Sequence, residues 1–219
     1  MNTPVWDFVE NYVNQNPVRL HMPGHKGGGE QERLDLTEIQ GADSLYEAEG
    51  IIAESEAIAT TLFGSGRTVF STEGSSQCIR AMLYLCSTMA EKGEQPLILA
   101  ARNAHKTFIY GAALMDLQVE WLWPEEDSRS LCSCLISAEN LEKQLSALPK
   151  KPCAVYITSP DYLGNVADIA GLAAVAHRHG CLLAVDNAHG AYLKFLPQSC
   201  HPIDLGADIC CDSAHKTLP

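Results

Sequence analysis

The chain has 219 residues, of which 46% are hydrophobic and 19% are charged, a composition typical of a globular protein with a sizeable core. Its 15 Lys and Arg residues against 27 Asp and Glu residues give a net charge of -12. This balance argues against general nucleic-acid binding, because phosphate contacts need clustered basic side chains. The sequence therefore favours small-molecule chemistry in one large domain.

The cysteine pattern and the N-terminal segment narrow the class of protein further. Nine cysteines could indicate disulfides, yet most of them lie inside apolar runs, and residues 1–4 carry no basic or apolar leader. We therefore expect reduced thiols and a cytoplasmic protein. No apolar run approaches the roughly 20 residues that span a bilayer. The Cys132-Ser133-Cys134 run lacks the CxxC spacing of a zinc site, so we predict no metal.

The predicted elements alternate between helices and short apolar strands. An amphipathic stretch over residues 6–13 precedes a Gly- and Pro-rich segment at 21–29, which predicts a loop. The pattern then predicts helices over 51–63, 77–90, 105–115, 138–148 and 169–179, and strands over 68–70, 96–100, 118–122, 154–157, 182–185 and 208–211. Short apolar runs separated by helices indicate a parallel sheet that is covered on both faces.

Chemically distinctive side chains follow these strands, where ligands of such sheets usually bind. The Gly74-Ser75-Ser76 turn before a helix offers amides and hydroxyls to a phosphate, and His105 follows the next strand. The later strands are followed by Thr158, by Asp186 and His189, and by Ser213, His215 and Lys216. Each of these alone has an ordinary explanation as a helix cap, a structural histidine or a solvated charge. Their joint occurrence at the strand ends of one sheet favours a ligand site.

This set of groups is the one that pyridoxal phosphate requires. The cofactor phosphate needs donors such as the amides of residues 74–76, and Ser213 offers a further hydroxyl. A carboxylate such as Asp186 keeps the pyridine nitrogen protonated, so that the ring can withdraw electrons. His105 can stack on the ring. Lys216 can form the imine with the cofactor aldehyde and later transfer protons.

Six segments together resemble the major domain of the Orn/Lys/Arg decarboxylase family, pyridoxal-phosphate enzymes of fold type I. They occur in family order, as His21-Met-Pro-Gly-His-Lys-Gly27, Glu73-Gly-Ser-Ser76, Arg102-Asn-Ala-His-Lys106, Ser159-Pro-Asp-Tyr-Leu-Gly164, Val185-Asp-Asn-Ala-His-Gly190 and Asp212-Ser-Ala-His-Lys-Thr-Leu218. The resemblance implies a three-layer α/β sandwich with a mostly parallel sheet. It also implies two parts of the chain: residues 1–50 form an N-terminal segment with an active-site loop, and residues 51–219 form a cofactor-binding large domain that is incomplete.

The resemblance also implies residue roles. Lys216 would bind the cofactor aldehyde, Asp186 would pair with the pyridine nitrogen, and His105 would stack on the ring. His215 would lie near the substrate carboxylate. The remaining cofactor contacts would come from Gly74, Ser75, Ser76, Gln77, Thr158, His189 and Ser213. His25 and Lys26, in the first segment, would serve a neighbouring subunit of a homodimer or higher oligomer.

The sequence departs from the family pattern at three places. Glu73 stands where the family has Asn, and Asn187 stands where it has Glu. Glu73 would repel a phosphate unless its carboxylate points away. The chain also ends at Pro219, whereas family members continue with a strand that enters the middle of the sheet. We therefore expect a sheet that is incomplete at the C-terminus, in a fragment or truncated product that is poorly active or inactive by itself.

The activity implied by the family is decarboxylation of arginine, lysine or ornithine to agmatine or a diamine. Two alternatives stay open. One is another pyridoxal-phosphate reaction on the same scaffold, by an aminotransferase, a carbon-sulfur lyase or an aldolase, because fold and cofactor do not fix which bond breaks. The other is a module that binds the cofactor or a partner without catalysis.

Overall fold

The structure is a computed structural model that describes residues 2–22, 24–124 and 133–218. The chain divides into two compact units, Met1–Phe70 and Ser71–Pro219, and each is described by itself. This division falls later than the boundary that the sequence suggests at residue 50. Residues 51–63 belong to the first unit, where they pack against the N-terminal helix. Cys132, one of the cysteines considered for a metal site, lies outside the described residues.

The first unit contains two helices and a 3-10 turn. Helix α1 spans Pro4–Asn14, η1 spans Glu32–Leu34 and α2 spans Ile51–Phe63. Pro4 opens α1, where its missing amide N–H costs nothing. Asp43 caps α2 from the preceding loop, since its carboxylate accepts hydrogen bonds from the amides of Gly50 and Ile52 at 2.8 and 3.0 Å. These bonds, with others from Glu49 and Ser44, outweigh the desolvation of the carboxyl and lower the pKa of Asp43 to about 2.

The predicted strand over residues 68–70 is wrong. This segment has no regular secondary structure, and Val69 and Phe70 are 59% and 44% exposed. Its amides bind side chains of α2: Thr68 donates to Thr60 Oγ1 and Phe70 donates to Glu56 Oε1, both at 2.8 Å. A strand needs a neighbouring backbone to pair with, and side-chain acceptors on α2 take that place here.

The second unit alternates strands and helices, as the sequence predicts. Its elements are α3 Gly74–Ser87, β1 Leu97–Ala101, α4 Lys106–Leu114, β2 Gln118–Leu122, α5 Ala138–Ala147, β3 Ala154–Thr158, α6 Ile169–Arg178, β4 Leu182–Asn187, η2 Ala191–Phe195, η3 Pro202–Leu205, β5 Ile209–Asp212 and α7 Ala214–Thr217. The five strands form one sheet in the order β2-β1-β3-β4-β5, and every pairing is parallel. The expected α/β sandwich is therefore confirmed.

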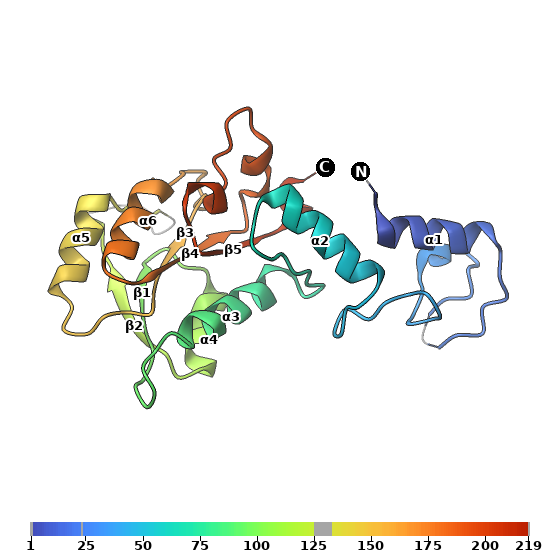
Figure 1. Ribbon diagram of the computed structural model, residues 1–219, viewed down its shortest axis with the longest axis horizontal. Coiled ribbons are helices and arrows are strands. Elements are labelled where there is room, and N and C mark those ends of the chain that lie inside the picture. Colours follow the sequence, from blue (N-terminus) through green and yellow to red (C-terminus); the bar gives the residue numbers. More distant parts are fainter. Residues whose placement is uncertain (1, 23, 125–132, 219) are drawn as a thin grey trace. The chain divides into compact units, whose positions relative to one another are not determined.

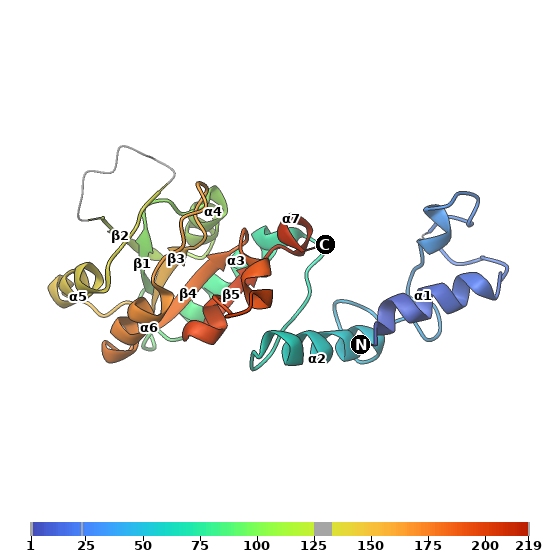
Figure 2. The same ribbon diagram turned by 90° about the horizontal axis from the view of Figure 1, so that it is seen from above.

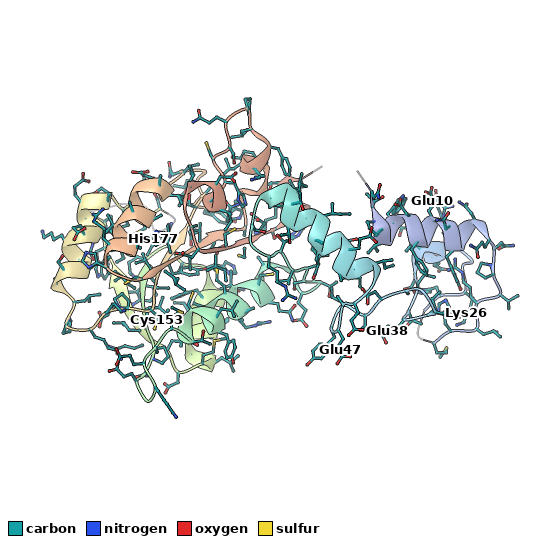
Figure 3. All side chains as sticks on the ribbon, in the orientation of Figure 1. Glu10, Lys26, Glu38, Glu47, Cys153 and His177 are labelled. Carbon is teal, nitrogen blue, oxygen red and sulfur yellow. The ribbon has the colours of Figure 1, made fainter. Side chains whose placement is uncertain are left out.

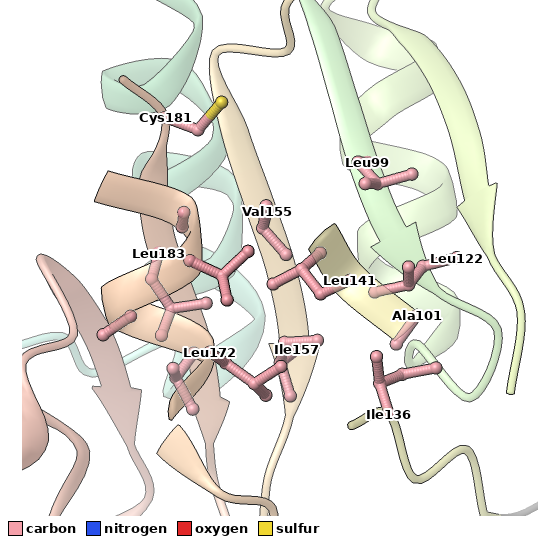
Figure 4. Close-up of a cluster of buried hydrophobic side chains, with 14 of the residues drawn as sticks. Leu99, Ala101, Leu122, Ile136, Leu141, Val155, Ile157, Leu172, Cys181 and Leu183 are labelled. Carbon is pink, nitrogen blue, oxygen red and sulfur yellow. The ribbon is translucent and has the colours of Figure 1, made fainter. Parts of the chain in front are cut away.

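Helices cover both faces of the sheet (Figures 1 and 2). Helices α5 and α6 lie on one face, over a core that includes Leu141, Val155, Leu172 and Leu183, all fully buried (Figure 4). Helices α3 and α4 lie on the other face, over a second core that includes Phe108 and Tyr156. Side chains alternate along a strand, so the central strands β1 and β3 contribute to both cores and read as continuous apolar runs, whereas the edge strand β2 alternates with exposed residues.

The two cores also assign the strand ends to faces. Residues 154, 156 and 184 belong to the core under α3 and α4, so Thr158 and Asp186, which continue the same alternation, lie on that face. Residues 155, 157, 183 and 185 belong to the other core, so Asn187 lies on the face of α5 and α6. Among the helices that the structure describes, none is long and apolar enough to cross a membrane.

Candidate functional site

The carboxyl ends of neighbouring strands bring the predicted residues of the second unit to one edge of the sheet. Strands β3, β4 and β5 are adjacent, and Thr158 pairs in register with Asp186, which in turn pairs with Cys211. Neighbouring parallel strands lie about 4.8 Å apart, so Thr158 and Asp186 are immediate neighbours. Lys216 lies in the short helix α7, three residues after Ser213, which begins the turn that follows β5.

Asp186 is a buried acid held by donors from three directions. It is 3% exposed, and its Oδ2 accepts a hydrogen bond from the Tyr156 hydroxyl at 3.3 Å. Its Oδ1 accepts from the Ala188 amide at 3.2 Å and from the Cys211 thiol at 3.6 Å. A buried carboxylate needs such donors to remain charged. The arrangement fixes the orientation of the carboxylate at the end of β4.

Tyr156 and Cys211 are not among the site residues that the sequence predicts. Burial, with the nearby charge of Asp186, raises the pKa of the Tyr156 phenol well above its usual value and so keeps the hydroxyl a donor. Burial likewise raises the pKa of the Cys211 thiol. The available signal was positional: Tyr156 stands two residues before Thr158 and therefore shares its face of the sheet.

The first turn of α3 presents the predicted phosphate donors. Gly74 has φ +68°, a left-handed conformation that favours glycine, and a Cβ at this position would meet nothing within 4 Å. Ser75 and Ser76 follow in the first turn, whose amide N–H groups have no partner within the helix. The Gln77 side chain accepts a hydrogen bond from the Ser71 hydroxyl.

The Glu73 carboxylate is paired with a cation, which reduces the repulsion that its charge would cause near a phosphate. Its partner is the Arg80 guanidinium one to two turns further along α3, with Oε2 and Nη2 3.5 Å apart. Both side chains are well exposed, at 65% for Glu73 and 39% for Arg80. The departure from the family pattern at this position is therefore compatible with anion binding at the start of α3.

His105 is linked to α3 by a short chain of hydrogen bonds. It caps α4, where its Nδ1 accepts from the Thr107 amide at 3.2 Å and lies 3.0 Å from the Thr107 hydroxyl. That hydroxyl lies 3.1 Å from the Ser76 hydroxyl. Since Nδ1 accepts from an amide, a neutral His105 carries its proton on Nε2. The ring is thus oriented by Thr107 and tied to the first turn of α3.

Lys216 lies beside His189, with its Nζ 3.3 Å from Nε2 of the imidazole. The edge of the His189 ring meets the Tyr162 ring at a centroid distance of 5.9 Å. His215, the other predicted catalytic residue in α7, is exposed. The structure therefore brings together Lys216 and His189, two residues that the sequence assigns to the cofactor site.

Among the described residues, three buried hydroxyls in β3 and around α7 have no hydrogen-bond partner, and two of them belong to predicted cofactor contacts; the third is Oγ1 of Thr217. The two at predicted contacts are Oγ1 of Thr158 and Oγ of Ser213, and Ser213 is only 3% exposed. Buried hydroxyls are normally bonded, because leaving one without a partner costs about 1–3 kcal/mol. Both hydroxyls were predicted as cofactor contacts, and both are available to a ligand.

His25 and Lys26 lie in the first unit, in the loop between α1 and α2 where Lys26 is labelled (Figure 3). The amide and the ring Nδ1 of His25 lie 2.8 and 2.6 Å from Oδ2 of Asp35. The amide hydrogen bond, with that of the ring, lowers the pKa of the Asp35 carboxyl. Lys26 Nζ donates to the carbonyl of His21. That His25 and Lys26 contribute to the site of a neighbouring subunit stays a prediction.

Comparison with solved structures defines the class of protein. The sheet is that of the large domain of fold type I, the fold of pyridoxal-phosphate enzymes. The constitutive lysine decarboxylase of E. coli aligns with 99% of this chain and 34% of its own chain, with a TM-score of 0.73 and 20% identity. Mouse CSAD in its apo form aligns with 79% of this chain and 40% of its own, with a TM-score of 0.63 and 23% identity. At these identities the likeness shows the fold alone.

Sequence comparison then gives the family. The sequence profile described as "Orn/Lys/Arg decarboxylase, major domain" matches residues 3–219, so the chain belongs to this family. Uncharacterized protein YaaO of Bacillus subtilis is 31% identical over 231 residues, which cover 100% of this chain and 47% of that protein. The arginine decarboxylase of Bacillus subtilis is 29% identical over 229 residues, which cover 98% of this chain and 45% of that protein. The chain thus spans about half the length of these relatives.

Proposed function

We propose that this chain is the cofactor-binding part of a pyridoxal-phosphate enzyme that decarboxylates a basic amino acid. The observation that carries the proposal is the edge of the sheet at β3, β4 and β5. There a buried, oriented acid at Asp186, two unbonded hydroxyls and the Lys216–His189 pair follow adjacent strands. Family membership supports decarboxylation over other reactions on this scaffold.

The residues fit the chemical groups of the cofactor. Asp186 would offer a carboxylate to the pyridinium N–H, and the Tyr156 and Ala188 donors orient that carboxylate. The unbonded hydroxyls of Thr158 and Ser213 offer donors that a ligand oxygen satisfies. When bound, the cofactor ring supplies the electron withdrawal that weakens a bond at the amino-acid α-carbon.

The remaining residues bind and orient. The first-turn amides of α3, with the hydroxyls of Ser75 and Ser76, would bind the phosphate at the positive end of the helix dipole. His105, oriented by Thr107, would lie against the ring. Gln77, which follows this turn and accepts from Ser71, would complete the contacts.

His189 is placed to manage the proton of Lys216. An amine attacks only as the neutral form, and a neutral His189 Nε2 at 3.3 Å can accept the proton that Lys216 Nζ must lose. His215, exposed beside Lys216, would meet the substrate carboxylate. We further propose a homodimer or higher oligomer in which His25 and Lys26 approach the site of a neighbouring subunit.

Product analysis tests the reaction. The chain, and a version extended to the length of its relatives, are incubated with pyridoxal phosphate and arginine, lysine or ornithine. Agmatine or a diamine, with carbon dioxide, is the expected product of the extended version. A keto acid would indicate an aminotransferase instead. Cofactor absorbance without turnover by either version would favour a module that binds without catalysis.

A further inference from the structure

A second cluster of ligand-type side chains lies on the opposite face of β5 from Cys211 and Asp186. His201, Cys210 and Asp212 each offer one ligand atom, and these three atoms all lie within 4.8 Å of one another. The His201 Nε2 lies 3.1 Å from the Asp212 Oδ2, and the Cys210 Sγ lies 3.9 Å from the same oxygen. We propose that His201, Cys210 and Asp212 form a zinc site.

The local fold explains why the three residues meet. Cys210 and Asp212 stand two residues apart in β5, so their side chains share one face of the sheet. Cys210 packs at the margin of the core under α5 and α6, whereas Cys211 belongs to the core under α3 and α4. His201 directly precedes η3, which packs against β5, and is 1% exposed. The cluster is therefore separate from the face that carries Asp186.

The separations match those of zinc ligands. Zinc binds Cys sulfur at about 2.3 Å and His nitrogen or carboxylate oxygen at about 2.0–2.2 Å, which places tetrahedral ligand atoms roughly 3.3–3.7 Å apart. The observed 3.1 and 3.9 Å bracket this range. The third separation, between the His201 and Cys210 ligand atoms, is within 4.8 Å, so side-chain rotations draw these two atoms together around the ion. Zinc binds the thiolate, so uptake releases the Cys210 proton to solvent.

An outer contact already holds one ligand in place. The Asn187 amide donates to Asp212 Oδ1, and Asp212 Oδ2 lies nearer to the His201 Nε2, at 3.1 Å against 3.4 Å for Oδ1, and to the Cys210 thiol. Such second-shell hydrogen bonds orient the ligands of metal sites, and their loss typically weakens metal binding about 10–100-fold. Three protein ligands leave the fourth tetrahedral position for water.

A zinc ion at this site would fix the position of the turn that carries Lys216. Zinc would join the segment before η3 to the end of β5, and Asp212 is followed by Ser213 and the α7 turn that carries Lys216. Bound metal would therefore fix the point from which the lysine-bearing turn departs. The site stands on its own ligands and does not depend on the proposed reaction.

Metal titration of the chain tests the proposal. The metal-free protein is titrated with Zn2+ against a chromogenic chelator, and with Co2+ to detect a sulfur-to-cobalt charge-transfer band. We expect one equivalent per chain with the band in the wild type. Cys210→Ser should lose the band, and Asp212→Asn should bind at least tenfold more weakly. Both changes nearly preserve side-chain volume, and circular dichroism checks that each variant is folded.

Cys200→Ser is the matched control, because Cys200 adjoins His201 but bonds to the Gln198 carbonyl. It should bind metal as the wild type does. A thermal shift gives a second readout: Zn2+ should raise the melting temperature of the wild type and of Cys200→Ser, but not of Cys210→Ser. The proposal is overturned if no metal is retained, or if Cys210→Ser binds Co2+ with an unchanged spectrum.

Discussion

Replacing Tyr156 with phenylalanine tests whether the buried hydrogen bond to Asp186 stabilises the site. The change removes only the hydroxyl that lies 3.3 Å from Asp186 Oδ2, and the ring keeps its contact with Phe108 at a centroid distance of 4.4 Å. Tyr156 is fully buried and Asp186 is 3% exposed, so water does not readily replace the lost donor. Hydrogen bonds to charged groups contribute about 1.5–3 kcal/mol. We expect the free energy of unfolding of Tyr156→Phe to fall by that amount.

Urea denaturation at neutral pH measures this loss, and Tyr84→Phe is the control. Tyr84 is 60% exposed, so its variant should stay within about 0.5 kcal/mol of the wild type. If Tyr156→Phe is as stable as the wild type, the carboxylate does not depend on this donor and the description of the site is wrong.

The same pair of variants gives a pH dependence. The raised pKa of the Tyr156 phenol means that the folded chain keeps its proton where the unfolded chain, with the usual value of 10.0, has lost it. This contribution to stability is complete below pH 10 and is lost as the pH rises above it. The wild type should therefore lose stability more steeply above pH 10 than Tyr156→Phe does. Equal slopes would contradict the burial of the phenol.

Three further predictions concern the two units. The lowered pKa of Asp43 stabilises the folded first unit above pH 4, and this stability is lost as the pH falls toward 2. Acid should therefore unfold helix α2, a transition that circular dichroism detects. The Asp43→Asn variant should lack this transition. Leu141→Ala in the core should cost about 2–5 kcal/mol in urea denaturation, whereas Leu163→Ala, 60% exposed, should cost under about 0.5 kcal/mol; similar losses would contradict the packing. Ser213→Ala removes a buried hydroxyl that has no hydrogen-bond partner, so the melting temperature should stay the same or rise. A spectroscopic titration should show pyridoxal phosphate binding about tenfold more weakly. Unchanged affinity would exclude Ser213 as a cofactor contact.

The sequence predicted the second unit well because its strands are buried on both faces. Such strands appear as short apolar runs: β3 spans Ala154–Thr158, one residue beyond the predicted 154–157. The edge strand β2 is the exception, because exposed residues alternate along it, yet it also lies at the predicted Gln118–Leu122. The predicted strand at 68–70 failed for the reason that its apolar residues are exposed and its amides bind α2. Whether a short apolar run becomes a strand depends on a neighbouring backbone, which local pattern does not reveal.

The site residues could likewise be predicted only where the order of the strands alone determines their position. Residues directly after strands could be placed at one edge from the topology alone, which is why Thr158, Asp186 and Lys216 were identified. Tyr156 lies inside a strand, and its role depends on which side chain faces it from β4. The sequence did not single out His201, Cys210 and Asp212, because their order along the chain matches no familiar metal-ligand pattern. Both contacts are set by packing between elements, which spacing along the chain does not encode.

The most direct test of the account is the position at which pyridoxal phosphate attaches. The chain is incubated with the cofactor, reduced with borohydride, digested, and mapped by peptide mass spectrometry. The account predicts that the label lies on Lys216 and that Lys216→Ala abolishes it, while Lys106→Ala retains it. A label on another lysine of the wild type, or undiminished labelling of Lys216→Ala, would contradict the site.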